Sequence, residues 1–223
     1  MGLAQPQLTD TAEAYLAGER QSEERHEYLD GKTYAMAGES LEHSTITANL
    51  IIRLGLQLLG KPCRTLSPNM KVRSGPSLEE QHTSKGMFSY PDVTVVCGEP
   101  RFHDPHRDVL LNPTLIIEVL SPTTEAFDRG EKFLRYRTSL ETLTDYVLVS
   151  QAHPLIEHFE RRPGGQWLYS SLDGLEGSLT FASIACSLRL AEVYDRITFP
   201  PEGSLLPPGE SGATGEPDPG HPD

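Results

Sequence analysis

Two nearly continuous apolar runs constrain the fold of this 223-residue chain more than any other feature. They are PDVTVVC at residues 91–97 and TLIIEVL at residues 114–120, and both are rich in β-branched and aliphatic residues. A strand with one solvated face alternates apolar and polar residues, whereas a continuous run is typical of a central strand covered on both faces. The chain is therefore expected to place other elements on both sides of a sheet.

The remaining pattern predicts helices and further strands around these two runs. Thr9 or Asp10 is expected to cap a short first helix, and the turn at Asp30-Gly31 leads into a strand at residues 32–37. Further strands are expected at residues 63–66, 69–73, 145–150, 154–160 and 166–170, and helices at residues 128–137 and 191–197. This order predicts an α/β or α+β sheet with one long helix packed on it.

The long helix is expected to begin after Ser40 and to present a wide apolar face to the sheet. One stripe at helical spacing is formed by Leu41, Thr45, Ala48, Ile52 and Leu59, with Ile46, Leu50 and Leu54 beside it. A stripe of this width is typical of a helix that lies on a sheet.

The length predicts one domain with an appendage, since domains usually hold about 100–200 residues. The domain is expected to span residues 1–199. Residues 200–223 are rich in Pro and Gly and contain five acidic residues but no Lys or Arg. Such a segment buries too little apolar surface to offset its ordering entropy, so it is predicted to be disordered. A second flexible stretch is expected at residues 74–89, where a loop beside a cleft is plausible.

The chain carries 19 Lys and Arg against 32 Asp and Glu, a formal net charge of −13. This charge disfavours broad attachment to a phosphate backbone or to anionic lipid. Contact with a nucleic acid would need a local basic patch or a bound cation, and no membrane association is expected.

The cysteines and the N-terminus predict a cytoplasmic protein. Cys63, Cys97 and Cys186 are widely spaced and include no C-x-x-C pair, so reduced, mostly buried thiols are expected rather than disulfides or a structural zinc site. Residues 1–10 lack the basic start and apolar segment of a signal peptide.

Glu118 is the chemical anomaly of the second apolar run, because a buried carboxylate must take up a proton or find a cation. If the two runs pair as antiparallel strands, Asp92 at the start of the first lies at the same end of the sheet as Glu118. Two carboxylates there, with a backbone carbonyl such as that of Val119, form a site suited to Mg²⁺ or Mn²⁺.

Lys132 is the preferred candidate for stabilising the charge that develops during a reaction at such a site. It follows Asp128 by one helical turn and would extend back over the end of the sheet. The same spacing is also that of an ordinary surface ion pair, and spacing alone favours neither interpretation.

Two further groups of polar residues have alternative explanations. His43 lies in the first turn of the long helix, where a role in the cleft competes with simple capping by Ser40. His103 and His106, with Asp104 and Asp108, resemble a small metal cluster, but Pro105 favours a solvated loop.

Four segments carry a resemblance to a known family: RHEYLDGKTYAMAG, YPDVTVV, LIIEVLSPTTEAFDRGEKFLRYR and DYVLVSQ. In this order they resemble a restriction-endonuclease-like family abundant in cyanobacteria, which belongs to the PD-(D/E)XK nuclease superfamily. The match covers residues 9–199. The resemblance implies a mixed central sheet flanked by helices, a divalent metal at one end of it, and phosphodiester hydrolysis.

The resemblance also implies roles for individual residues. Asp92 after Pro91 matches the first acidic element of the superfamily, and Glu118 matches the second. The lysine expected two residues after the glutamate is replaced by Leu120. Lys132 in the segment DRGEK occupies the place to which this family is expected to have moved the basic group.

Two more candidates come from the same resemblance. Glu27 matches an acid that such folds aim at the metal from the first helix, although a solvated charge beside Glu23 and Glu24 explains it equally well. Asn69 stands where relatives carry an acid, and its amide oxygen would ligate a metal more weakly.

The sequence therefore predicts a Mg²⁺-dependent endonuclease that acts on DNA, with Lys71, Arg73 and Lys85 guiding the backbone. The alternative is a catalytically inert interaction module on the same fold, suggested by the missing lysine at position 120 and by the acidic charge. A homodimer is plausible in either case, because symmetric cleavage of two strands needs two sites.

Overall fold

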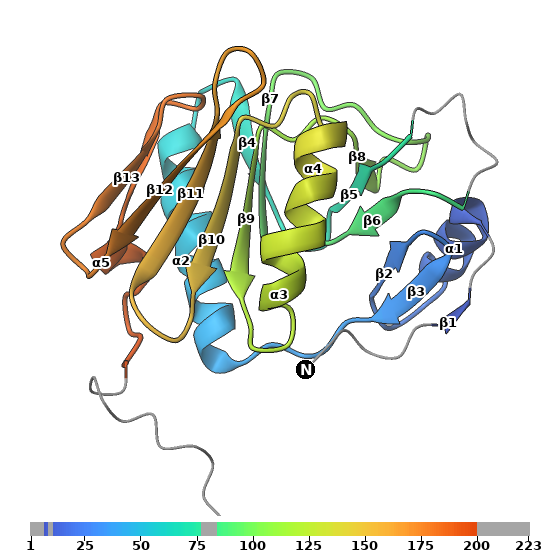
Figure 1. Cartoon of the computed structure of the whole chain (residues 1–223), viewed down its shortest axis with the longest axis horizontal. Coiled ribbons are helices and arrows are strands. Elements are labelled where there is room, and N and C mark those ends of the chain that lie inside the picture. Colours follow the sequence, from blue (N-terminus) through green and yellow to red (C-terminus); the bar gives the residue numbers. More distant parts are fainter. Residues whose placement is uncertain (1–6, 9–10, 77–83, 200–223) are drawn as a thin grey trace, which may run out of the picture.

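A computed structural model describes residues 7–8, 11–76 and 84–199 of the chain (Figure 1). The described residues form two six-stranded sheets and one separate β-hairpin, with helices against them. The predicted tail at residues 200–223 lies outside the described residues, as does the middle of the stretch at residues 74–89.

The larger sheet contains the two predicted central strands as neighbours. Its strands are β4 (Cys63–Leu66), β7 (Val93–Cys97), β9 (Leu115–Leu120), β10 (Asp145–Ser150), β11 (Leu155–Arg161) and β12 (Trp167–Asp173). Their order is β12-β11-β10-β9-β7-β4. β9 and β10 are parallel and all other neighbours are antiparallel, so this is a mixed sheet.

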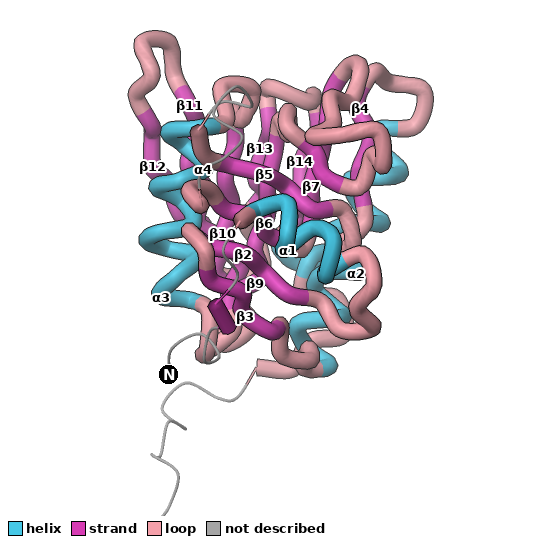
Figure 2. Tube along the Cα trace, turned by 90° about the vertical axis from the view of Figure 1, so that its right-hand side faces the viewer, coloured by secondary structure: helices cyan, strands magenta, loops and turns pink. Residues whose placement is uncertain are grey.

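The smaller sheet is formed by the N-terminal part of the chain and the strands around residues 71–110. Its strands are β1 (Gln7–Leu8), β2 (His26–Leu29), β3 (Lys32–Ala35), β5 (Lys71–Ser74), β6 (Met87–Ser89) and β8 (Val109–Leu110), in the order β1-β3-β2-β6-β5-β8. The turn between β2 and β3 places Asp30 and Gly31 at positive φ, as a two-residue hairpin requires. Figure 2 shows this sheet in front of the larger one.

Helices cover both faces of the larger sheet, while α1 (Ala12–Glu19) packs on the smaller sheet. The helices on the larger sheet are α2 (Leu41–Leu58), α3 (Glu125–Phe127), the π-helical turn η2 (Asp128–Lys132), α4 (Phe133–Ser139) and α5 (Leu190–Val193). α2, α5 and the hairpin of β13 (Ser178–Phe181) and β14 (Cys186–Arg189) lie on one face, and α3, η2 and α4 lie on the other (Figure 1). The first helix is capped by Thr11, not by Thr9 or Asp10 as expected.

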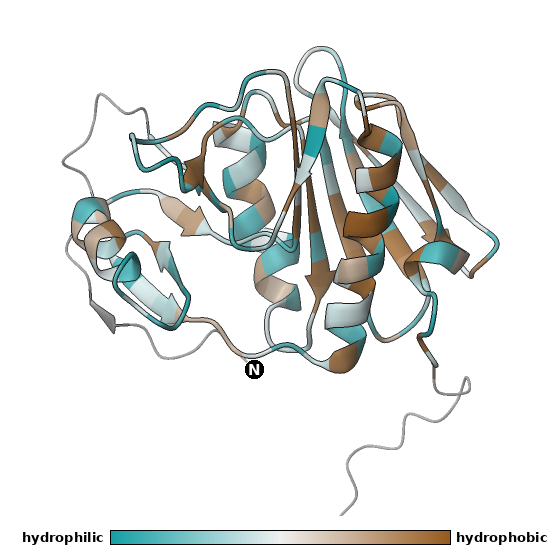
Figure 3. Cartoon of the chain, turned by 180° about the vertical axis from the view of Figure 1, so that it is seen from behind, coloured by the Kyte–Doolittle hydropathy of each residue, from teal (hydrophilic) through white to brown (hydrophobic). Residues whose placement is uncertain are grey.

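Side chains of β9 alternate between two apolar cores. Leu115, Ile117 and Val119 pack with α2, whereas Ile116 and Leu120 pack with Phe133 and its neighbours on the opposite side. All six residues of β9 are buried, and Figure 3 shows the apolar character of the central strands. The prediction of central strands covered on both faces is therefore confirmed.

The prediction for the apolar face of α2 is confirmed in part. The helix packs through Ile46, Leu50 and Leu54, which were expected beside the stripe, and through Leu58. The stripe residues Leu41, Ile52 and Leu59 are exposed, as is Leu56. The helix has two apolar faces, and its periodicity does not show which of them meets the sheet. Among the described residues no helix is both long and apolar enough to cross a membrane.

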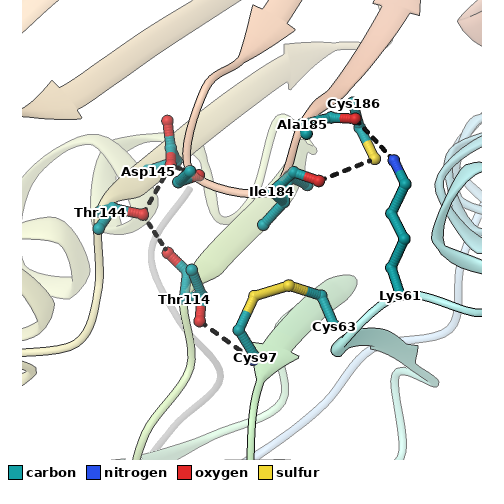
Figure 4. Close-up of a disulfide and its surroundings, with 10 residues drawn as sticks. Lys61, Cys63, Cys97, Thr114, Thr144, Asp145, Ile184, Ala185 and Cys186 are labelled. Carbon is teal, nitrogen blue, oxygen red and sulfur yellow. Dashed lines mark hydrogen bonds between the residues drawn. A yellow bond between two sulfur atoms is a disulfide. The ribbon is translucent and has the colours of Figure 1, made fainter.

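The prediction that the thiols are all reduced is also wrong. Cys63 and Cys97 form a disulfide between β4 and β7 (Figure 4), while Cys186 is a buried free thiol. The two half-cystines are 34 residues apart in sequence, but the antiparallel register sets them directly opposite each other. Sequence spacing did not reveal this pairing, because only the register of the strands brings the residues together.

Candidate active site

Asp92 and Glu118 converge at one end of the larger sheet. β7 and β9 are antiparallel with Val93 opposite Ile117, and the same register extended by one residue sets Asp92 opposite Glu118. Glu118 lies on the face of β9 that also carries Ile116 and Leu120. The Asp92 carboxylate accepts a hydrogen bond of 2.7 Å from the backbone N–H of Val119, and its charge contributes to the raised pKa of Glu118. The predicted pair therefore lies at one end of the sheet.

Lys132 lies between the carboxylates of Glu118 and Asp128, on the π-helical turn η2. Its Nζ atom is 3.1 Å from Glu118 Oε1 and 3.3 Å from Asp128 Oδ1. The side chains of all three residues are at most 6% exposed. The interpretation of Asp128 and Lys132 as an ordinary surface pair is therefore excluded. π-turns within helices frequently occur at functional sites.

Glu27 reaches the same cluster from the smaller sheet. It lies on strand β2, not on the first helix as the resemblance implied, and its Oε1 atom is 3.4 Å from Lys132 Nζ. The carboxylate also accepts a hydrogen bond from the backbone N–H of Tyr90. Glu27 is therefore not the solvated charge of the alternative explanation.

His43 combines both of the roles that were considered for it. Its backbone N–H donates to the Ser40 hydroxyl at the start of α2, and its Nε2 atom is 3.4 Å from Asp92 Oδ2. Burial lowers the pKa of the ring, but the hydrogen bond and charge of Asp92, with the charge of Glu39, outweigh it and raise the pKa overall. The imidazole holds the Asp92 carboxylate from the side of α2.

The cluster has an excess of negative charge. Burial raises the pKa of Glu118 well above its ordinary value, and the charges of Asp128, Asp92 and Glu27 add to this rise while Lys132 opposes it. Burial alone would lower the pKa of Lys132, but the surrounding carboxylates hold it well above the ordinary value. One ammonium group thus contacts three carboxylates, and Asp92 adds a fourth acid to the cluster.

These residues fit a divalent cation as a pair of carboxylates and not as a larger ligand cluster. No group of three or more His, Cys, Asp or Glu side chains suited to a metal ion occurs within the described ranges. Glu118 Oε1 is buried and, apart from its ion pair with Lys132, accepts no hydrogen bond. Hard oxygen donors with unsatisfied negative charge suit Mg²⁺ or Mn²⁺.

The cluster lies in a cavity of about 520 Å³ between the two sheets. One wall is formed by residues 34–40, which connect β3 to α2, and the facing wall by residues 121–124. The lining combines the charged groups described above with Arg25, Tyr34, Met36, Tyr90 and Phe127. The cavity gives the buried carboxylates a path to solvent.

Asn69 lies outside this cavity lining. It is exposed, and its Oδ1 atom accepts a hydrogen bond of 3.4 Å from Arg25, which does line the cavity. Its proposed contribution as a metal ligand has no support from this position.

Two of the basic residues expected to guide DNA are already engaged within the protein. Lys71 is buried and pairs with Asp108 at 3.1 Å, and Arg73 donates to the backbone carbonyl of Pro76. Lys71 is therefore not a surface contact for DNA.

The loop with His103 and His106, which was expected to be solvated, is held against the protein. Asp104 and Asp108 of this loop both pair with Arg20 at 2.7 Å.

Sequence reasoning missed three side chains of the cavity: Arg25, Tyr34 and Tyr90. Tyr34 had a usable signal, since the two-residue turn at Asp30-Gly31 fixes the hairpin register that sets it opposite Glu27. Arg25 and Tyr90 had no comparable signal, because their positions follow from the docking of the two sheets.

The fold is that of a nuclease-like α/β protein. The structure is similar to that of a "putative nuclease belonging to DUF820" from Anabaena variabilis, with a TM-score of 0.63 and 16% sequence identity over 82% of this chain and 97% of that chain. A likeness at this identity shows the fold.

The family follows from sequence matches. The model of the Uma2 family, described as "Putative restriction endonuclease", matches residues 12–190, and the chain belongs to this family. Two uncharacterized proteins of Synechocystis sp. are similar: slr1290 is 35% identical over 84% of this chain and 92% of its own length, and sll1609 is 33% identical over 77% and 92%. The restriction-endonuclease-like family and fold expected from the sequence are confirmed.

Proposed function

We propose that this protein is a divalent-metal-dependent endonuclease that hydrolyses phosphodiester bonds of DNA. The observation that carries the proposal is the convergence of Asp92 and Glu118 at one end of the sheet, with Lys132 Nζ 3.1 Å from Glu118. The family description and the nuclease-like fold support the same chemistry.

The residues that would hold Mg²⁺ or Mn²⁺ are Asp92, Glu118 and the backbone carbonyl of Val119, with water completing the ligand set. When bound, the cation supplies Lewis-acid polarisation of the phosphate and makes water a stronger acid. It also offsets the negative charge of the cluster, which otherwise repels a phosphodiester.

The remaining groups act on the phosphate and on the ligands. Lys132 donates hydrogen bonds from Nζ to the negative charge that develops on the phosphate oxygens. Glu27 and Asp128 hold the Lys132 ammonium from two sides, and His43 holds the Asp92 carboxylate. The site thus positions its ammonium group before substrate arrives.

The test is cleavage of plasmid and oligonucleotide DNA with MgCl₂ by the parent protein and by Asp92→Asn, Glu118→Gln and Lys132→Met. Each variant is expected to lose activity by roughly 100-fold or more, the usual scale for removing a group that stabilises the transition state. Glu176→Gln, which changes an exposed acid in the turn before β13, serves as the matched control and is expected to retain activity.

Calorimetry with MgCl₂ separates this function from the alternative of an inert module. The parent and Glu176→Gln are expected to bind the cation, and Glu118→Gln is expected to bind it more weakly. Absence of cation binding and of cleavage in the parent would favour the inert module.

The homodimer and the cytoplasmic location remain predictions. The exposed apolar residues Leu41, Ile52 and Leu56 of α2 do not by themselves identify an interface. The disulfide between Cys63 and Cys97 is uncommon in a reducing compartment, so it gives the cytoplasmic prediction no support.

A further inference from the structure

The carboxylates are recessed in a cavity of about 520 Å³ and do not lie on an open face of the protein. An unpaired strand can extend a single nucleotide into such a recess, whereas a base-paired nucleotide is held within its duplex. Glu118 lies deep in this cavity, with a side chain that is 3% exposed. The volume suits a ligand of the size of one nucleotide, since small-molecule sites span ~300–1,000 Å³.

The wall formed by residues 34–40 is fixed at both sides of the cavity. The Ser40 hydroxyl donates to Gln151 Oε1 at 2.9 Å, which joins this wall to the loop after β10. Glu39 pairs with Arg25 at 3.8 Å and with His43 at 3.7 Å. Figure 1 shows the connection between β3 and α2 passing the end of β9. The wall therefore restricts access to the cluster.

Tyr34 is placed for stacking on a nucleobase. It lies directly opposite Glu27 in the antiparallel register of β2 and β3, where the Cβ atoms of such pairs are about 5 Å apart. Glu27 contacts Lys132, so the Tyr34 ring lies one side chain away from the reactive cluster. The ring is half-buried and lines the cavity, and within residues 11–76 and 84–199 it has no aromatic neighbour and its hydroxyl no hydrogen bond.

We propose that the site takes an unpaired DNA strand, and that Tyr34 stacks on the base next to the phosphate that is cut. This inference rests on the proposed nuclease function and names its substrate class. Stacking on an aromatic ring tolerates any base, because every base has a π face. Met36 and Phe127 extend the apolar part of the cavity around the base.

The experiment compares an oligonucleotide of random sequence with the same oligonucleotide annealed to its complement, both in MgCl₂. The parent is expected to cut the single strand at least tenfold faster, measured as kcat/KM. Tyr34→Ala is expected to lose roughly 5- to 150-fold on the single strand, the usual range for one stacked base. Tyr34→Phe keeps the ring and is expected to stay close to the parent.

A binding measurement keeps the inference separate from the proposed function. Fluorescence anisotropy in CaCl₂, without hydrolysis, is expected to show that the protein binds the labelled single strand more tightly than the duplex. Tyr34→Phe is expected to bind the single strand about as tightly as the parent, and Tyr34→Ala more weakly. Equal activity on duplex and single strand, or an unchanged Tyr34→Ala, would overturn the inference and leave the nuclease function intact. Failure of the parent to cut either DNA would overturn the nuclease function, and Tyr34-dependent binding would still support the unpaired strand as ligand.

Discussion

At the scale of single residues, the site depends on the ammonium group of Lys132, which three carboxylates share. Lys132 contacts Glu27, Glu118 and Asp128, all within 3.4 Å, in a part of the protein from which water is nearly excluded. Leu120 explains why the ammonium group does not come from β9 itself. Leu120 lies on the same face of β9 as Glu118, but its side chain packs in the apolar core beneath α4. A lysine at position 120 would bury its charge in that core.

Lys132→Met is expected to lower the free energy of unfolding by about 3–5 kcal/mol, because it leaves carboxylates buried without their cation. Glu118→Gln removes one of these charges and is expected to cost less. The double variant Lys132→Met/Glu118→Gln is expected to lose less than the sum of the two single variants. Urea unfolding in EDTA measures all three, and strict additivity would contradict this coupling.

At the scale of elements, the disulfide joins an edge strand to the interior of the sheet. β4 has only β7 as a neighbour, and the bond between Cys63 and Cys97 connects them across a segment of 34 residues. In the chain-entropy account, a crosslink that closes a loop of this length stabilises the folded protein, because it lowers the conformational entropy of the unfolded chain.

The variant Cys63→Ala/Cys97→Ala is expected to lower the free energy of unfolding by roughly 2–4 kcal/mol under oxidising conditions. Dithiothreitol is expected to destabilise the parent by a similar amount and to leave the variant unchanged. Cys186→Ala serves as the control for loss of a thiol. Thiol titration of the unfolded parent should give one free thiol without reductant, and three would contradict the disulfide.

Elements also show how far the sequence determines this structure. The apolar runs around Val95 and Ile117 predicted their strands and their common environment, because buried strands have a local composition signal. The disulfide was missed and the main stripe of α2 is exposed, because both depend on packing and register, whereas Ile46 and Leu50 beside the stripe are buried as expected. Asp92, Glu118 and Lys132 were predicted to converge and do so, whereas Tyr90 was missed because only the docking of the two sheets places it in the cavity.

At the scale of the whole molecule, acids outnumber bases, and several arginines are paired with acids of the same chain. Arg129 pairs with Glu125 and Glu157, and Arg135 pairs with Asp30 and Glu131. A net charge of −13 disfavours a protein that binds many phosphates of a duplex.

Binding of a single strand in CaCl₂ is therefore expected to depend weakly on salt. Arg25 and Lys132 are the basic side chains among the described residues that line the cavity. Two phosphate contacts predict that log K falls against log [NaCl] with a slope of about −1.4. Anisotropy titrations between about 50 and 200 mM NaCl measure this slope. The expected value follows from ~0.7 for each phosphate contact with a single strand. A slope steeper than about −4 would indicate an extended basic surface instead.

The composition of the site from two sheets has a consequence for regulation by folding. Asp92 and Glu118 belong to the larger sheet, whereas Glu27 and Tyr34 belong to a short hairpin joined to the other strands of the smaller sheet through β6. If the hairpin undocks, the larger sheet keeps its hydrogen bonds and Asp92, Glu118 and Lys132 stay in place, but Glu27 and Tyr34 leave the cavity. The activity proposed for this site is therefore expected to appear only after the N-terminal hairpin has docked onto the larger sheet.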